Sequence, residues 1–196
     1  MMRARLVFVL LLLGLALLAR TAGAGEATDQ LRADIDELYR SVNATATPPS
    51  SAARAAARPI VDRMFDWAAM AEASLRGYWP KRTPAERAEF TRLFSDVFAR
   101  AYLSRIHLVD ARNFQYLGDT TAGDRGTVKT TILTNRGSTL DVDYLVQASP
   151  ARRWLVQDVR VEGISLIDNY RVQFDSIIGK SSYEELVNRL RTVATR

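Results

Sequence analysis

The sequence contains no cysteine and only one histidine, His107, among its 196 residues. Without cysteine the chain can form no disulfide, no thiolate metal site, no catalytic thiol and no lipid attachment through an N-terminal cysteine. One histidine gives no support to a zinc or copper site or to a Ser-His-Asp arrangement. No phosphate-binding loop and no G-x-G-x-x-G motif is present. These absences predict no metal, no cofactor and no enzyme of a common class.

Residues 1–24 have the pattern of a secretory signal peptide. Arg3 and Arg5 precede an apolar run over residues 6–18, and Ala22-Gly23-Ala24 offers a small-x-small cleavage site. The run is shorter than the roughly 20 residues that a transmembrane helix needs, although an uncleaved N-terminal anchor is the alternative. We expect cleavage after residue 24 and export to the periplasm.

The basic character of the chain is concentrated in that segment. The formal net charge is +5. Residues 1–24 contain three arginines and no acidic residue, so the mature chain carries +2. A charge this small gives no support to a nucleic-acid partner.

The first half of the mature chain has helical spacing. The clearest start is Thr83-Pro84-Ala85-Glu86, which combines an N-cap, a proline at the first helical position and a capping box. Apolar residues three and four apart predict helices over residues 28–42, 52–58, 59–75 with a bend, and 84–107.

The second half changes to the period of two that strands show. We expect strands at residues 113–117, 127–134, 139–147 and 153–161, with a turn at Gly118-Asp119. Gly163 then breaks the pattern, and helical spacing returns over 166–178 and 182–193. The order predicts one α+β domain, residues 25–196, with a curved four-stranded antiparallel sheet. Helices would pack on its concave face and enclose an apolar cavity.

Charged residues flank the junction between the last strand and the next helix. Asp158 and Glu162 could form an acid/base pair, because paired carboxylates with separated pKa values do such chemistry. The alternative is an ion pair with Arg171 that fixes the strand to the helix.

Large apolar side chains are more numerous than a tight core obviously needs. They include Phe90, Phe94 and Phe98 in the long helix. They either fill a core or line a pocket for a long apolar ligand, and periodicity predicts the same pattern for both.

Several motifs resemble the MlaC, or toluene-tolerance, family. The run from Val159 to Phe174 (VRVEGISLIDNYRVQF) looks like the family signature, as does Trp79 followed by TPAERAEF at residues 83–90. The segments YLGD at 116–119 and WLVQD at 154–158 match in order, so the resemblance covers nearly all of the mature chain. Leu75-Arg76-Gly77 departs from the family, which often has Leu-Gly directly.

The resemblance implies a soluble periplasmic carrier of phospholipid, with acyl chains between the sheet and the helices. Its partners would be a diacyl phospholipid, an outer-membrane lipoprotein complex and an inner-membrane ABC transporter with an MCE-domain ring. Such a carrier would maintain the lipid asymmetry of the outer membrane, and we expect it to be a monomer.

The resemblance and the periodicity together select thirteen residues as the lining of the lipid site. The face of each strand is inferred from the period, and a bulge would invert part of a strand. The selected residues are Met64, Phe94, Phe98, Tyr102, Val128, Ile132, Val142, Tyr144, Trp154, Val156, Ile167, Tyr170 and Phe174.

Three other functions stay open at this point. A carrier of hopanoid or another terpenoid lipid would use a similar pocket. A small-molecule isomerase on a cone-shaped α+β fold would need a carboxylate or tyrosine pair in the pocket. A protein-binding adaptor would have a closed core and no ligand.

Overall fold

The computed structural model describes residues 25–42, 48–134, 137–151 and 153–194, without the side chains of residues 110–112. The predicted signal peptide, residues 1–24, lies outside these ranges. In the part of the chain that is described, no helix is both long and apolar enough to cross a membrane.

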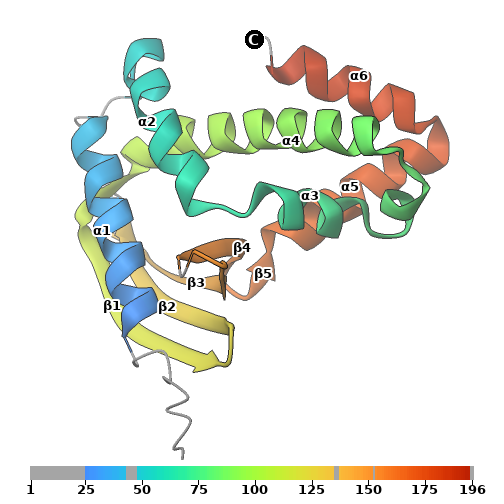
Figure 1. Ribbon diagram of the computed structural model, residues 1–196. Coiled ribbons are helices and arrows are strands. Elements are labelled where there is room, and N and C mark those ends of the chain that lie inside the picture. The colour runs from blue at the N-terminus through green and yellow to red at the C-terminus, as the bar shows by residue number, and fades with distance from the viewer. Residues whose placement is uncertain (1–24, 43–47, 135–136, 152, 195–196) are drawn as a thin grey trace, which may run out of the picture.

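Helices make up the first half and the end of the described chain (Figure 1). The α-helices are α1 (Glu26–Ser41), α2 (Ser51–Met64), α3 (Trp67–Leu75), α4 (Pro84–Arg105), α5 (Leu166–Lys180) and α6 (Tyr183–Ala194). The 3-10 helices η1 (Arg76–Lys81) and η2 (Ile106–Leu108) follow α3 and α4. The capping box of α4 is formed as predicted, with Thr83 and Glu86 bonded reciprocally.

The sheet is open and antiparallel, with neighbours in the order β1-β2-β3-β4-β5. Its strands are β1 (Val109–Ala122), β2 (Arg125–Thr134), β3 (Thr139–Ala148), β4 (Trp154–Val161) and β5 (Ile164–Ser165). The prediction of four strands was therefore wrong by one. Glu162 (φ 52°) and Gly163 (φ 75°) form a two-residue turn of the tight hairpin kind, so β5 folds back onto β4 before α5 begins.

Strand β1 is also longer than predicted. The expected turn at Gly118-Asp119 is a β-bulge, because the register of β1 against β2 shifts between Tyr116 and Gly118. Gly118 takes a φ of 104°, which glycine adopts without steric cost. The strand continues past the bulge to a hairpin at Gly123-Asp124.

One face of the sheet is buried and is the face predicted from the period of two. Val128 pairs with Tyr144, and Thr130 pairs with Val142, across β2 and β3. All four of these side chains are buried, whereas Lys129 and Asp141 on the other face are exposed. Figure 1 shows β1 and β2 curving around α1, which covers this buried face.

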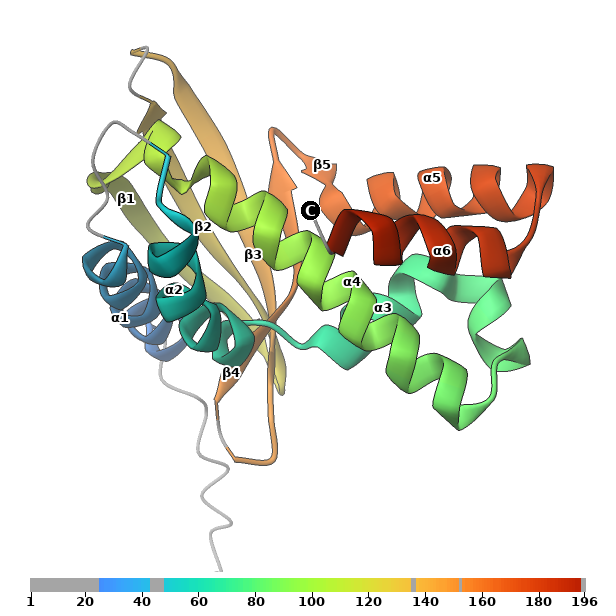
Figure 2. The ribbon, with the colours of Figure 1, turned by 90° about the horizontal axis from the view of Figure 1, so that it is seen from above.

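The helices form two groups joined by α4 (Figure 2). Helices α1 and α2 lie over the sheet, and α3, α5 and α6 extend beyond it. Helix α4 packs on α2, where Arg58 pairs with Asp96 at 2.7 Å, and on α6, where Arg191 pairs with Glu89 at 2.5 Å. The helices therefore cover more than the concave face alone, because α5 and α6 pack mainly against other helices.

Candidate functional site

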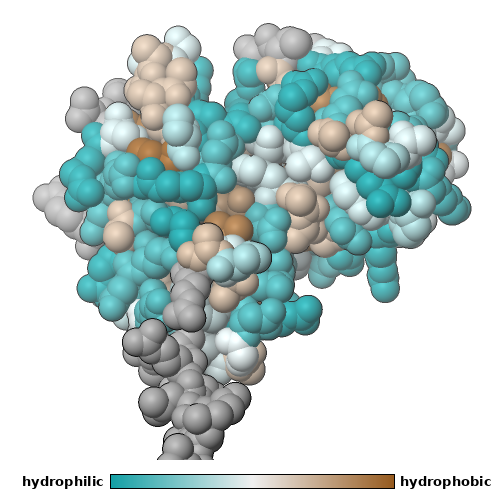
Figure 3. Space-filling view, viewed as in Figure 1, coloured by the Kyte–Doolittle hydropathy of each residue, from teal (hydrophilic) through white to brown (hydrophobic). Residues whose placement is uncertain are grey.

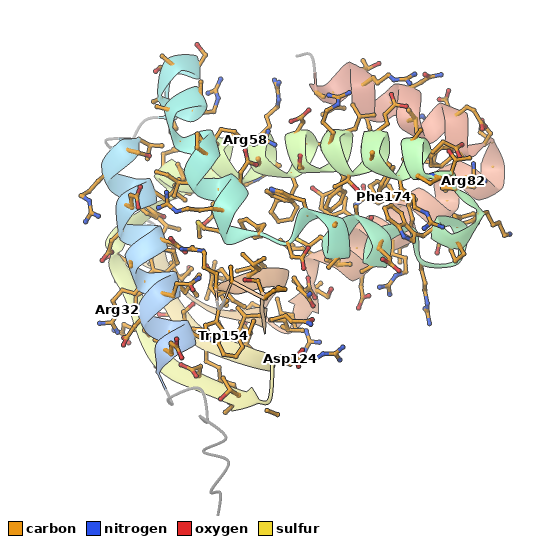
Figure 4. The ribbon with its side chains drawn as sticks, in the orientation of Figure 1. Arg32, Arg58, Arg82, Asp124, Trp154 and Phe174 are labelled. Carbon is orange, nitrogen blue, oxygen red and sulfur yellow. The ribbon has the colours of Figure 1, made fainter. Side chains whose placement is uncertain are left out.

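The sheet side of the predicted site forms one apolar surface. Val128, Ile132, Val142, Tyr144, Trp154 and Val156 all point into the interior and are at most 6% exposed. Trp154 is fixed at the edge of this surface by α1, since the Gln30 side chain donates to the Trp154 carbonyl at 2.6 Å and accepts from its amide at 2.9 Å. Figure 4 shows Trp154 against the sheet.

The helix side is a chain of aromatic rings. The Phe94 ring lies 6.0 Å from Phe98, 5.4 Å from Tyr170 and 6.3 Å from Phe174, centroid to centroid. Phe174, labelled in Figure 4, lies between α4 and α5. Rings in such edge and tilted contacts attract one another beyond their burial. In this structure the helix side is therefore packed, ring against ring.

All thirteen predicted residues belong to the core or pack directly against it. Met64 and Ile167 are buried with the sheet and ring residues, and Tyr102 and Tyr170 are half-buried. The structure thus brings the thirteen together, on facing surfaces of the sheet and the helices. Their contact with lipid, and the enclosed cavity, stay predictions.

Residues outside the thirteen complete the same interior. Phe65 contacts Phe98 at 5.2 Å and Tyr102 at 5.8 Å, and its backbone bridges to Val156 of β4. On the other side, Phe114 and Tyr116 of β1 stack at 6.1 Å. The alternation of Phe114 and Tyr116 in the sequence could have identified them. The spacing of Phe65 after Ile60 and Met64 predicts that it faces inward, and it is buried.

The tyrosine hydroxyls of this interior are held neutral. Burial raises the pKa of Tyr102 to about 12 and raises the pKa of Tyr144 well above its usual range. The nearby hydroxyls of Tyr102, Tyr116 and Tyr39 raise the pKa of Tyr144 further. The site can therefore offer O–H donors and apolar surface, but no tyrosinate base at neutral pH.

Comparison with known proteins gives a family and a fold. The family model described as MlaC protein matches residues 32–192. The chain belongs to the MlaC family. A solved phospholipid-binding protein from Ralstonia solanacearum, in complex with a phospholipid, is similar with a TM-score of 0.64 and 22% identity, over 86% of this chain and 93% of that one. This likeness shows that the two share a fold. No curated protein matches the sequence.

In this MlaC-family chain the charged side chains at the junction between β4 and α5 form hydrogen bonds with backbone groups. The Asp158 carboxylate accepts from the amides of Val159 at 2.8 Å and Ile167 at 3.1 Å. Glu162 accepts from the amide of Asp141. Arg171 pairs with Asp168 and donates to the Ala73 carbonyl, so neither the acid/base pair nor the ion pair considered from the sequence is formed.

The departure at Leu75-Arg76-Gly77 is accommodated as a turn of 3-10 helix. Arg76 has a φ of 43° where α3 passes into η1. Trp79, which follows, is buried against Phe90 and lies under the Arg87 guanidinium. The extra residue therefore leaves the aromatic elbow packed.

Two surface hollows of about 510 Å³ each are lined by described residues. One lies between α2, α4 and the end of α6, where Figure 3 shows a gap, and is lined by Arg54, Arg58 and Arg100 among others. The other lies on the exposed face of the sheet, near Thr121 and Gln157. Within the described ranges, no group of three or more histidine, aspartate or glutamate side chains is placed to hold a metal ion.

Proposed function

We propose that this MlaC-family protein binds a diacyl phospholipid between its sheet and its helices and carries it through water. One observation supports this most directly: the chain shares its fold with a protein solved in complex with a phospholipid. The facing apolar surfaces of sheet and helices are the part of this chain that can take acyl chains.

The energetics favour a carrier rather than a one-way acceptor. Moving one methylene from water into an apolar interior is worth about 0.8 kcal/mol. Two acyl chains therefore bind strongly relative to water. The membrane solvates them equally well, so a protein interior that only equals the membrane can both extract and return the lipid.

Uptake requires the interior to open. The rings of Phe94, Phe98 and Tyr170 contact one another, so acyl chains have to separate or displace them. Helix α5 follows β5 directly and packs mainly on helices. We therefore expect α5, with the end of α4, to move relative to the sheet when lipid enters.

We propose that the protein crosses the periplasm with its lipid and that it does so as a monomer. We infer export from the signal-peptide pattern of residues 1–24. The partners that we propose follow from family membership: an outer-membrane lipoprotein complex and an inner-membrane MCE-domain ABC transporter. Shuttling between them would maintain the lipid asymmetry of the outer membrane.

A catalytic role has little support from the charged residues of the junction. The Asp158 and Glu162 carboxylates accept hydrogen bonds from backbone amides. Both carboxylates are used structurally, so these two residues are not set aside for proton transfer. A binding function without a cofactor fits this interior better.

A vesicle assay tests the proposal. Mature protein is mixed with donor vesicles that carry a fluorescent phospholipid and with unlabelled acceptor vesicles. We expect extraction of the phospholipid by the protein alone, and transfer that rises with protein concentration. Competition by a hopanoid but not by unlabelled phospholipid would instead assign a terpenoid cargo. No extraction of either lipid would contradict the carrier function.

A further inference from the structure

Four tyrosines from four elements meet on the buried face of the sheet. Tyr116 of β1 pairs with Thr130 of β2, and Thr130 pairs with Val142 of β3. Tyr144 lies two residues further along β3 and therefore points to the same face. The helices contribute Tyr39 from α1 and Tyr102 from α4. We call Tyr39, Tyr102, Tyr116 and Tyr144 the tyrosine cluster.

Ring contacts join Tyr39, Tyr116 and Tyr102 to the apolar interior. Tyr144 lies close enough to all three for their hydroxyls to raise its pKa. The Tyr39 ring meets the Phe114 ring edge-on at 5.9 Å, and Phe114 stacks on Tyr116 at 6.1 Å. On the helix side, Tyr102 meets the Phe65 ring at 5.8 Å. The cluster thus borders the surfaces proposed to hold acyl chains.

The cluster contains a buried donor that the protein itself does not satisfy. The Tyr116 hydroxyl is buried and has no hydrogen-bond partner among the described residues. The neighbouring Thr130 hydroxyl, in contrast, donates to the Val142 carbonyl at 2.9 Å. Buried polar groups in native proteins are nearly always paired, so an unpaired one calls for a partner from outside the chain.

The tyrosine cluster extends from the buried interior towards the protein surface. Tyr144 is 3% exposed and lies beneath the helices. At the other end, the exposed Arg32 of α1 places its guanidinium 4.7 Å from the Tyr116 ring centroid. Figure 4 shows Arg32 at the outer side of α1. From the interior outward, the order is apolar rings, neutral hydroxyls and then the charges of Arg32 and Asp36, both of which act on the Tyr116 hydroxyl.

A diacyl phospholipid has the same order of groups. Its acyl chains are apolar, its ester linkages are neutral hydrogen-bond acceptors, and its phosphate is an anion. We propose that the tyrosine cluster donates hydrogen bonds to an ester carbonyl of the bound lipid, with Tyr116 and Tyr144 as the principal donors. This inference rests on the proposed function and adds to it a site that recognises the linkage between glycerol and acyl chain.

The test compares two lipids that differ only in that linkage. Equal amounts of a diacyl phospholipid and its dialkyl ether analogue, with the same head group and chain lengths, compete for the mature protein. Native mass spectrometry measures the ratio of the two bound masses. We expect the wild type to favour the ester lipid about 2- to 10-fold, the range for one hydrogen bond.

Variants assign the preference to the cluster. Tyr116→Phe, Tyr144→Phe and the double variant keep the rings and remove only the hydroxyls. We expect the ratio to fall towards one while the total lipid load is kept. Tyr183→Phe is the control, because its hydroxyl donates to the Glu86 carbonyl of α4, outside the cluster. That variant should keep the wild-type ratio.

Every other result of these experiments contradicts either the ester site or the carrier function. A wild-type ratio of one, or a preference kept in the double variant, would refute the ester site and leave the carrier function intact. Binding of neither lipid would refute the carrier function itself. The infrared carbonyl band of lipid bound to the wild type gives an independent test: it should lie at lower frequency than for the same lipid in a dry apolar solvent, and an unshifted band would refute the site.

Discussion

At the scale of single residues, Asp158 illustrates a buried acid used by the fold. It is 9% exposed and joins β4 to the start of α5 through the amides of Val159 and Ile167. The Ile167 amide belongs to the first turn of α5, where helix amides have no partner within the helix. Asp158 therefore supplies a hydrogen-bond acceptor for an amide that has none within α5.

We predict that Asp158→Ala lowers the free energy of unfolding by about 1–3 kcal/mol, since it leaves buried amides unpaired. Asp158→Asn keeps an acceptor oxygen and should cost less. Urea denaturation followed by circular dichroism measures both. Asp175→Ala, at an exposed position of α5, serves as the matched control. Equal stability of Asp158→Ala and this control would show that the carboxylate contributes nothing to the junction.

At the scale of elements, the hairpin between β4 and β5 sets the direction in which α5 leaves the sheet. Gly163 takes a φ of 75° in open space. A side chain at this φ clashes with its own backbone and costs about 1–2 kcal/mol. We predict that Gly163→Ala is destabilising by about that amount.

Gly179→Ala is the control. It should raise the melting temperature, because Gly179 is helical, has no positive φ and has room for a methyl group. Equal melting temperatures for the two variants would contradict this assignment.

The capping box of α4 predicts a pH dependence. Hydrogen bonds from the Thr83 amide at 2.7 Å and the Thr83 hydroxyl at 2.9 Å hold the pKa of Glu86 below its ordinary value of 4.5. A folded-state pKa below the unfolded one gives stability that is present above pH 4.5 and is lost as the pH falls through the folded pKa.

A double-mutant cycle of Thr83→Ala and Glu86→Gln measures the part of this coupling that the Thr83 hydroxyl contributes, because alanine keeps the backbone amide. We expect a stabilising coupling energy near neutral pH that disappears in acid, measured by urea denaturation at a series of pH values. A coupling that stays constant across the series would mean that the Glu86 charge plays no part in its bond with the Thr83 hydroxyl.

At the scale of the whole molecule, the sequence predicts the layers better than their connections. The periods of 3.6 and two identify the helical segments and β2 to β4, because each buries one side along its length. The boundary expected at Pro59 was wrong, since Pro59 lies inside α2. The two-residue β5 is too short to show a period. The bulge at Gly118 looks like a turn in the sequence because glycine serves both.

The candidate site was predictable as a core but not as a binding site. The same alternation that directs Val142 and Tyr144 inward would fill a closed core, so sequence period carries no information on a ligand. The tyrosine cluster depends on contacts between α1, β1, β3 and α4. Its four members are 14 to 105 residues apart in the sequence, so no local sequence pattern predicts that they meet.

A charge in the interior should remove lipid binding while leaving the surface unchanged. Phe98 is 3% exposed and contacts Phe65, Phe94 and Tyr170. We predict that Phe98→Glu, and Tyr102→Glu at a half-buried position, lose bound lipid, because an unpaired charge in an apolar site is strongly unfavourable. Val172→Glu, at a position that is 69% exposed on α5, should keep its lipid. A folded Phe98→Glu protein with a full lipid load would show that the lipid lies elsewhere.

The most direct measurement is native mass spectrometry of the mature protein purified from cells, followed by extraction and identification of the bound lipid. A carrier of this kind is expected to retain one diacyl phospholipid, seen as a mass above that of the polypeptide and recovered in the extract. A mature protein that stays at the mass of the polypeptide alone, even after incubation with phospholipid vesicles, would contradict the assignment.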